Sequence, residues 1–323
     1  MLTRREMLVG AGVASAIALA GRVKTTLASA SQPSTPVNFD VPKGACDCHT
    51  HIFGDPRRFP YDAGRPYTPE SASVSEMRAL HRALHTDRVV IVNPSVYGTD
   101  DSCTLDAIKE LGPSARGIAV IGDKTSNADL DLLHRGGIRG IRVNLETAGQ
   151  PDLSVARQRV KAAVERIEGR SEWHVEIYTR LSVIEAIRDE VAASSVPIVF
   201  DHFGGTQAAL GVHQPGFDVL LSLVESGKAY VTISAPYRSS VIAPDFPDVA
   251  PLAKALVAAN PQRILWGTDW PHPRQIPGRN PEEITPFSQI DDGRDFNQLA
   301  DWVPDAAQRK TILVDNPARL YGF

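Results

Sequence analysis

The sequence predicts a single-domain (β/α)₈ barrel. Eight short runs are rich in Val and Ile and are flanked by Gly, Pro or Asp, as expected of parallel strands buried on both faces. Amphipathic runs with helical spacing separate most of them. A doubly wound open sheet is the competing fold class, but no Gly-x-Gly-x-x-Gly motif follows an early strand. The repeated alternation over 323 residues therefore favours the closed barrel.

The predicted elements alternate along the chain from residue 44 onward. The strands are predicted at 45–51, 88–94, 116–121, 137–144, 173–179, 197–203, 229–234 and 263–269. The helices between them are predicted at 74–85, 103–111, 127–135, 155–168, 181–193, 216–226 and 249–259. Catalytic groups of such a barrel lie at the carboxyl ends of the strands. Polar residues collect at these positions, so we expect a pocket at that end.

Residues 1–30 have the character of an export signal. Residues 3–8 contain a twin-arginine pair, a modestly apolar run covers 8–20, and Ala28 and Ala30 offer a small-x-small cleavage site. This pattern is typical of Tat signals, which direct folded proteins to the bacterial periplasm. An amphipathic helix that stays attached is the alternative. Residues 31–43, which contain Ser, Pro, Thr and Asn, are predicted as a linker, and 44–323 as the barrel domain.

The composition excludes several classes of protein. A formal net charge of −4 gives no basic footprint for nucleic acid. The apolar run of the leader is too short for a transmembrane helix, so no stable membrane association is expected. Three cysteines, two of them in a Cys-x-Cys pair, are too few for a disulfide framework. The oligomeric state stays open.

The segment 47–51, Asp-Cys-His-Thr-His, ends the first predicted strand. Because side chains alternate between the two faces of a strand, Asp47, His49 and His51 are expected on one face. Two imidazoles beside a carboxylate can hold a metal or polarise a substrate carbonyl. Two polar residues at a strand end are the simpler alternative.

Three motifs in order carry a family resemblance: residues 47–51, the Asp-His-Phe-Gly-Gly run at 201–205, and the Trp-Gly-Thr-Asp-Trp-Pro-His run at 266–272. Together they resemble the amidohydrolase superfamily. Within it, residues 44–323 are similar to the lactone-acting branch that includes 2-pyrone-4,6-dicarboxylate hydrolase, sugar-acid lactonases, galactarolactone isomerase and 4-sulfomuconolactone hydrolase.

The resemblance implies roles for four residues. Asp269 becomes the general base for the attacking water, and His49, His51 and His202 become either metal ligands or hydrogen-bonding partners of the lactone carbonyl. Some members of the branch bind zinc and others need no metal, so both mechanisms stay open. No lysine stands on the fifth strand to bridge two metals, although Glu176 could ligate one. We expect enclosure in an apolar mouth to raise the pKa of Asp269.

Arginines near strand ends indicate an anionic substrate. A guanidinium can clamp a carboxylate or sulfonate through two hydrogen bonds, and Arg142 and Arg238 are placed for this, with Arg274 a weaker third. Surface or salt-bridge roles are the alternative for each arginine. The further substrate-binding candidates are Tyr178, Ser95 and His272.

The favoured hypothesis is a periplasmic hydrolase that opens a small anionic lactone, with Asp269 and His202 as its catalytic groups and a single zinc ion as a possible cofactor. The candidate substrates are 4-sulfomuconolactone, pyrone dicarboxylate and a sugar-acid lactone. The enzyme alternatives are a metal-dependent decarboxylase and a lactone isomerase. A periplasmic sugar-acid binding protein is the alternative without catalysis.

Overall fold

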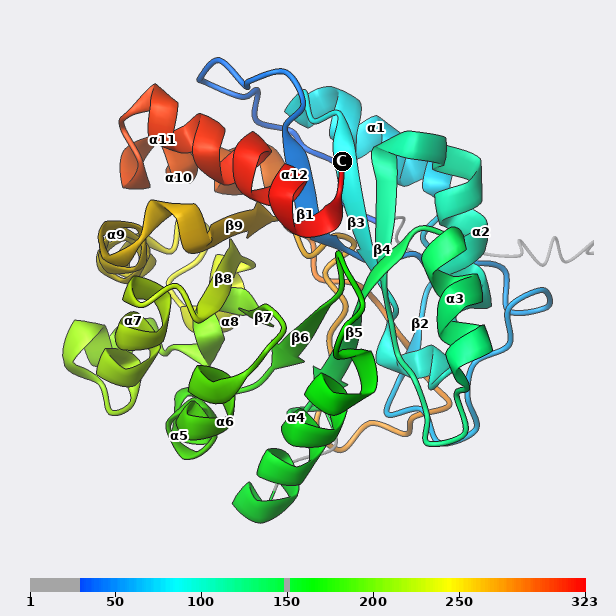
Figure 1. Ribbon diagram of the computed structural model, residues 1–323. Coiled ribbons are helices and arrows are strands. Elements are labelled where there is room, and N and C mark those ends of the chain that lie inside the picture. Colours follow the sequence, from blue (N-terminus) through cyan, green and yellow to red (C-terminus); the bar gives the residue numbers. More distant parts are fainter. Residues whose placement is uncertain (1–29, 148–151) are drawn as a thin grey trace, which may run out of the picture.

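The computed structural model of the protein describes residues 30–147 and 152–323. Eight parallel strands form one sheet whose order follows the chain, and helices surround it (Figure 1). The strands are β1 (Cys46–Thr50), β3 (Arg88–Val92), β4 (Ala115–Ala119), β5 (Ile138–Asn144), β6 (His174–Tyr178), β7 (Ile198–Phe200), β8 (Ala229–Ser234) and β9 (Ile264–Gly267). The predicted (β/α)₈ barrel is confirmed, and every strand overlaps its predicted range.

The barrel closes between the segment after β9 and the end of β1. The backbone N–H of Asp269 donates to the carbonyl of His49 at 2.8 Å, and the N–H of His51 donates to the carbonyl of Trp270 at 2.8 Å. These hydrogen bonds join the two segments that carry the first and third sequence motifs. Closure of the ring therefore brings Asp269 to the two histidines although more than two hundred residues separate them.

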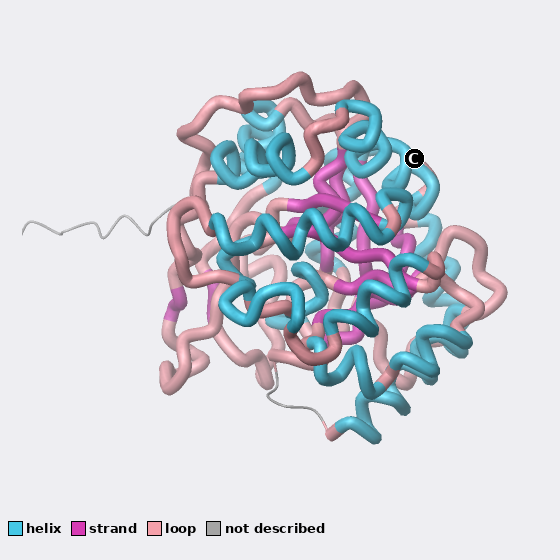
Figure 2. The backbone as a smooth tube through the Cα atoms, turned by 90° about the vertical axis from the view of Figure 1, so that its left-hand side faces the viewer, coloured by secondary structure: helices cyan, strands magenta, loops and turns pink. Residues whose placement is uncertain are grey.

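Helices cover the outside of the strands, as the view turned by 90° shows (Figure 2). They are α1 (Val74–Leu84), α2 (Ser102–Leu111), α3 (Asn127–Arg135), α4 (Leu153–Ile167), α5 (Leu181–Ala186), α6 (Arg188–Ala193), α7 (Phe217–Glu225), α8 (Pro236–Ser239), α9 (Ala250–Ala259), α10 (Asp292–Trp302), α11 (Ala306–Lys310) and α12 (Asn316–Tyr321). The helix predicted at 181–193 is divided at Ile187, whose φ of −99° and ψ of 9° interrupt it. Within the described ranges, no helix is long and apolar enough to cross a membrane.

Three features of the fold were not predicted. Helices α10, α11 and α12 follow the last strand, and a short parallel pair, β2 (Thr68–Pro69) and β10 (Ile284–Thr285), joins two long loops. The base of the barrel holds an inner apolar cluster that includes Cys46, Cys48, Val90, Val92 and Tyr321. The Arg116 side chain fixes the C-terminus there by donating to the carbonyls of Tyr321 and Gly322 at 3.1 and 2.6 Å. A ligand must therefore enter from the opposite end.

The segment 31–43, predicted as a linker, contains no helix or strand and lies against the barrel. The indole N–H of Trp270 donates to the carbonyl of Ser31 at 2.9 Å. The hydroxyls of Ser34 and Thr35 both donate to Oδ2 of Asp291 at 2.6 Å, and their backbone N–H groups donate to its Oδ1. The predicted leader lies outside the described residues apart from Ala30, which is buried.

Asp291→Ala should destabilise the protein because it removes four hydrogen bonds to the N-terminal segment and the N-cap of α10. Loss of a cap alone costs about 1–2 kcal/mol, and we expect at least that at pH 7. Burial alone would raise the pKa of Asp291, but the hydrogen bonds of Ser34 and Thr35 outweigh burial and lower it. The stabilisation should therefore be present above about pH 4 and fade as the pH falls further.

Urea unfolding of the Asp291→Ala variant at pH 7 and at acidic pH measures both effects. Asp305→Ala is the matched control, because Asp305 caps α11 through the Ala307 N–H at 2.8 Å. A cost equal to that of the control would show that the bonds to Ser34 and Thr35 contribute nothing.

Candidate active site

A cavity of about 190 Å³ opens at the carboxyl ends of the strands. With water occupying roughly 30 Å³ per molecule in the liquid, this volume suits a small ligand. Most of the predicted site residues line it: His51, Ser95, Arg142, Tyr178, His202, Arg238 and Asp269. They come from different strands, so the barrel assembles the site from distant parts of the sequence.

Asp269 is the point at which the site converges. Its carboxylate is fully buried, and its backbone has a φ of 65° in the left-handed region. Oδ2 accepts hydrogen bonds from the Tyr237 hydroxyl at 2.6 Å and from Arg238 Nε at 2.7 Å. Oδ1 is buried and has no hydrogen-bond partner among the residues that the structure describes. One carboxylate oxygen is thus fixed, and the other is left for chemistry.

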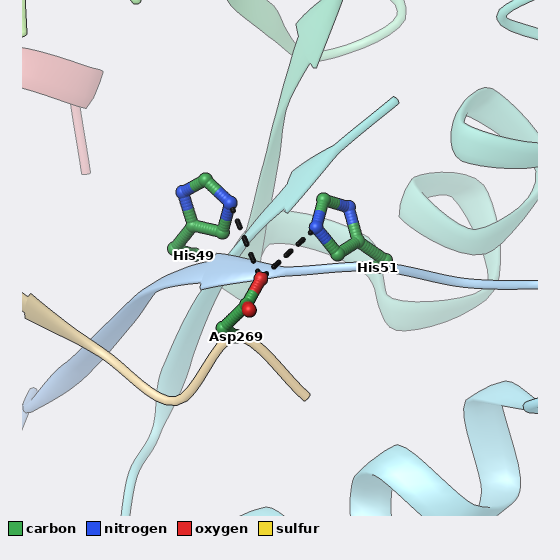
Figure 3. A group of neighbouring side chains, drawn as sticks. All are labelled: His49, His51 and Asp269. Atoms are coloured by element: carbon green, nitrogen blue, oxygen red, sulfur yellow. Dashed lines mark ion pairs between the residues drawn. The ribbon is translucent and has the colours of Figure 1, made fainter. Parts of the chain in front are cut away.

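Three imidazoles point at this Oδ1. The Nε2 atoms of His51, His49 and His202 lie 3.2, 3.7 and 3.8 Å from it. Figure 3 shows His49 and His51 turned from β1 toward Asp269. Both histidines of the first motif, the histidine of the second and the aspartate of the third therefore meet in one place, as expected.

The tautomer of His51 follows from its hydrogen bond. Nδ1 lies 2.8 Å from the Val92 carbonyl, which can only accept, so Nδ1 carries a hydrogen. Burial lowers the pKa of His51 to about 4, so the ring is neutral near pH 7. Its Nε2 then presents a lone pair to the carboxylate of Asp269. Two electron-rich atoms at 3.2 Å need a cation or a proton between them.

Asp269 is ionised, contrary to our expectation of a raised pKa. Burial alone would raise its pKa, but the charge of Arg238 together with His202 and His51 outweighs burial and holds the pKa well below its usual range. The mouth of the barrel is polar where the sequence suggested an apolar enclosure. His202, in contrast, has its pKa lowered by burial, and its Nδ1 lies 2.8 Å from the Ser234 hydroxyl.

His49 faces two carboxyl groups through its other nitrogen. Nδ1 lies 3.5 Å from Asp201 and 3.6 Å from Glu176. Burial alone would lower the pKa of His49, but the charges of Asp201 and Glu176 raise it. Burial itself raises the pKa of Glu176 to about 8. Glu176 and Asp201 thus sit behind His49, on the side away from Asp269.

The donor set fits a single divalent metal. Imidazole nitrogens and carboxylate oxygens are ligand types that zinc prefers, and His49, His51 and Asp269 lie close enough to share one ion. The hydrogen bond from His51 to a carbonyl is the second contact that usually fixes a metal-binding tautomer. A second group joins His49 and His202 to Asp201. Among the described residues, Glu176 belongs to neither group.

The charges lining the cavity favour an anion. Three guanidinium groups line it: Arg142, Arg238 and Arg274. The lining acids are Asp269 and Glu146, and Arg180 pairs with Glu146 from outside the lining. The ring of Tyr178 lies between two of the cations, with its centroid 5.7 Å from Arg142 and 5.8 Å from Arg238. Positive charge therefore exceeds negative charge around the cavity.

Residues 46–323 match the family model described as amidohydrolase. The chain belongs to the amidohydrolase family. It is 35% identical to 4-sulfomuconolactone hydrolase of Rhizobium radiobacter, with 90% of this chain and 93% of the relative covered. It is 34% identical to 2-pyrone-4,6-dicarboxylate hydrolase of Comamonas testosteroni, with 90% and 94% covered. An apo crystal structure from Agrobacterium tumefaciens is 26% identical with a TM-score of 0.73, and covers 90% and 98% of the two chains.

The resemblance inferred from the three motifs is thereby confirmed, and the protein is a hydrolytic enzyme. In this amidohydrolase, one residue of the first motif does not join the site. Asp47 accepts from the Thr268 hydroxyl at 2.7 Å and lies 3.2 Å from Nε2 of His81. The strand register shifts between Asp47 and Thr50, which breaks the strict alternation of side chains. Oδ1 of Asp47 accepts from the backbone N–H of His49 at 3.3 Å. Asp47 therefore supports the junction of β1 with the Asp269 segment.

His272 does not line the cavity, so the substrate contact expected of it is not seen. It is completely buried, and its two ring nitrogens face Tyr237 and Asp292. Its φ of 66° turns the loop after Asp269 back into the protein, which removes the ring from the mouth. The third motif placed His272 near the site, but it did not indicate where the side chain points.

Tyr237 was expected to hydrogen-bond the substrate or to pack in the core, and it instead donates to the carboxylate of Asp269. Asp201 was not selected as a site residue. It lies 3.5 Å from Nδ1 of His49 and accepts a hydrogen bond from Nη2 of Arg142 at 3.2 Å. Its position directly after β7 and before His202 was an available signal. Asn144, Glu146, Tyr67 and Gln275 also line the cavity.

Proposed function

We propose that the protein hydrolyses the ring ester of a small anionic lactone. The observation that carries the proposal is Oδ1 of Asp269, which has no hydrogen-bond partner within the described part of the chain and lies where three imidazole Nε2 atoms converge beside guanidinium groups. The names of the relatives, 4-sulfomuconolactone hydrolase and 2-pyrone-4,6-dicarboxylate hydrolase, support the substrate class. We favour 4-sulfomuconolactone, an anion expected from the breakdown of aromatic sulfonates.

Asp269 performs the proton transfers. Tyr237 and Arg238 fix Oδ2, so Oδ1 accepts a proton from the water that attacks the lactone carbonyl carbon. As the ring C–O bond breaks, the same carboxyl group returns that proton to the departing oxygen. The product is an open-chain acid, and Asp269 ends the cycle ionised.

The neighbouring residues assist these transfers. Zinc held by His49, His51, His202 and Asp269 would lower the pKa of water toward about 7 and polarise the carbonyl. Without a metal, the Ser234 hydroxyl can donate to Nδ1 of His202, which leaves a hydrogen on Nε2 to donate to the carbonyl oxygen. Arg142 holds an anionic group of the substrate against the ring of Tyr178.

Hydrolysis of a lactone panel tests the proposal. The purified protein should consume 4-sulfomuconolactone or 2-pyrone-4,6-dicarboxylate and release the open-chain acid, identified by mass spectrometry. Formation of an isomeric lactone would favour the isomerase, and release of CO₂ would favour the decarboxylase. Recovery of every lactone unchanged, with binding detected by calorimetry, would favour a binding protein.

Arg142→Gln should weaken turnover of the anionic lactone. Loss of a hydrogen bond to a charged group costs about 1.5–3 kcal/mol, which corresponds to roughly a 10- to 100-fold fall in kcat/KM. The substitution also removes the pair of Arg142 with Asp201, which costs turnover of every lactone. Neutral lactones should lose less than anionic ones, because they lose only this second contribution. Arg57→Gln is the control, since that side chain is exposed and pairs with Asp55 away from the cavity. An equal loss on neutral and anionic lactones would contradict the role.

The twin-arginine leader supports a periplasmic location, which we propose for the mature protein. Cell fractionation of the full chain should recover the processed enzyme in the periplasm. Replacement of Arg4 and Arg5 by Lys should retain the unprocessed chain in the cytoplasm. Equal distribution of both forms would contradict export by this route.

A further inference from the structure

A line of buried polar groups links α10 to the carboxylate of Asp269. Nε2 of His272 lies 3.1 Å from Oδ2 of Asp292, in the first turn of α10. Nδ1 of the same ring lies 3.3 Å from the Tyr237 hydroxyl, which reaches Oδ2 of Asp269 at 2.6 Å. The contacts therefore run without interruption from Asp292 to Asp269.

The direction of the hydrogen bonds follows from the number of protons. The Tyr237 hydroxyl has one hydrogen, and the ionised carboxylate of Asp269 can only accept it. The Tyr237 oxygen must then accept from His272, so Nδ1 carries a hydrogen. One further proton is shared between Nε2 of His272 and Oδ2 of Asp292. Every contact in the line is satisfied by this arrangement alone.

The two outer members cannot touch the substrate. His272 and Asp292 are 0% and 1% exposed, and neither lines the cavity. The His272 ring also meets the Tyr237 ring edge to face, with centroids 5.5 Å apart. The backbone N–H of His272 donates to the carbonyl of Asp269 at 2.8 Å, and a side-chain substitution leaves this bond in place. The side-chain hydrogen bonds of the pair reach the carboxylate of Asp269 through Tyr237.

We infer that His272 and Asp292 are positioning residues that hold the Tyr237 hydroxyl on Oδ2 of Asp269, so that Oδ1 stays directed at the attacking water. The kinetic part of this inference rests on the proposed function. Tyr237 restrains the carboxylate from one side and Arg238 from the other. Without the hydrogen bond from His272, the hydroxyl is free to rotate away, and Oδ1 loses its fixed direction.

Two substitutions at His272 separate positioning from simple support of the fold. The side-chain amide of Asn can occupy the place of Nδ1 and still donate to Tyr237, whereas that of Gln occupies the place of Nε2 and reaches Asp292. We expect His272→Gln to lower kcat about 10- to 100-fold with KM unchanged. Losses of this size are typical when a residue that orients a functional side chain, without touching the substrate, is replaced. His272→Asn should retain most of the activity. Equal losses in both variants would overturn the inference.

A double-mutant cycle tests whether His272 acts through Tyr237. Tyr237→Phe alone and Tyr237→Phe combined with His272→Gln should have the same kcat, because the hydroxyl that His272 holds is absent from both. If the fall in kcat of the double variant equals the product of the two single falls, His272 acts by another route.

Nuclear magnetic resonance of ¹⁵N-histidine-labelled protein gives a reading that needs no substrate. Loss of one signal set in His272→Asn assigns this ring among the nine histidines. Nδ1 should be protonated, and its signal should shift in Tyr237→Phe but not in Arg57→Gln. An unprotonated Nδ1 would overturn the inference, whether or not any lactone is hydrolysed. A protonated Nδ1 that responds to Tyr237→Phe, found without turnover of any lactone, would reject only the proposed function.

Discussion

Asp269→Asn is expected to abolish ring opening while the barrel stays folded. The amide oxygen can still accept from Tyr237 and Arg238 in place of Oδ2, so the side chain keeps its position. The amide nitrogen then stands where Oδ1 stood and cannot take a proton from water. Loss of a general base lowers turnover about 10²- to 10⁴-fold, and we expect kcat to fall within or beyond this range.

Steady-state kinetics on the best lactone of the panel measures the loss, and circular dichroism checks the fold. Asp47→Asn is the matched control, because Asp47 is equally buried and bonds to Thr268, but lies outside the cavity. The control should lose stability and keep its activity per folded molecule. Full activity of Asp269→Asn would reject Asp269 as the base.

The strands and the meeting of the four principal groups were predictable because both follow from residue types. Buried parallel strands need continuous apolar runs, and the ends of those runs share one edge. His49 lies near the end of the first run and Asp269 just after the last, so the closed ring places them together. The same reasoning does not depend on any side-chain detail.

The directions of individual side chains were not predictable. The register shift after Asp47 is one extra residue in a strand, and no residue type in 47–51 announces it. His272 and Asp269 both adopt a positive φ, which reverses the side chain relative to its strand and needs support from the surrounding structure. The charge state of Asp269 depends on Arg238, whose approach is set by α8 rather than by sequence proximity.

The contacts of the N-terminal segment were not predictable from its composition. The segment 31–43 has a linker composition, yet Asp291 holds it through hydrogen bonds to backbone and hydroxyl groups, which composition does not reveal. Asp291 is the N-cap of helix α10, and Asp292 is the first residue of that helix. The N-terminal end of α10 therefore binds the N-terminal segment through Asp291, and it begins the hydrogen-bonded series from Asp292 to Asp269.

Removal of a bound divalent metal should lower the turnover of the lactone at least about 100-fold. The lone pair of His51 and the charge of Asp269 face each other at 3.2 Å, and a cation between them resolves their repulsion. A metal also contributes several kcal/mol of transition-state stabilisation, and each 1.36 kcal/mol is tenfold in rate. Elemental analysis should find a single zinc ion per chain, and zinc added after chelation should restore the rate.

His51→Ala tests whether metal binding and activity depend on the same residue. This variant should lose both zinc and activity, because it removes a ligand whose tautomer Val92 fixes. His81→Ala is the control, since His81 is also a buried histidine but contacts Asp47 outside the cavity, so the zinc content should not change. Full activity of metal-free protein would contradict a metal requirement. In that case Nε2 of His202 would polarise the carbonyl. Ser234→Ala should then lower activity more than His51→Ala, because it removes the hydroxyl that sets the tautomer of His202.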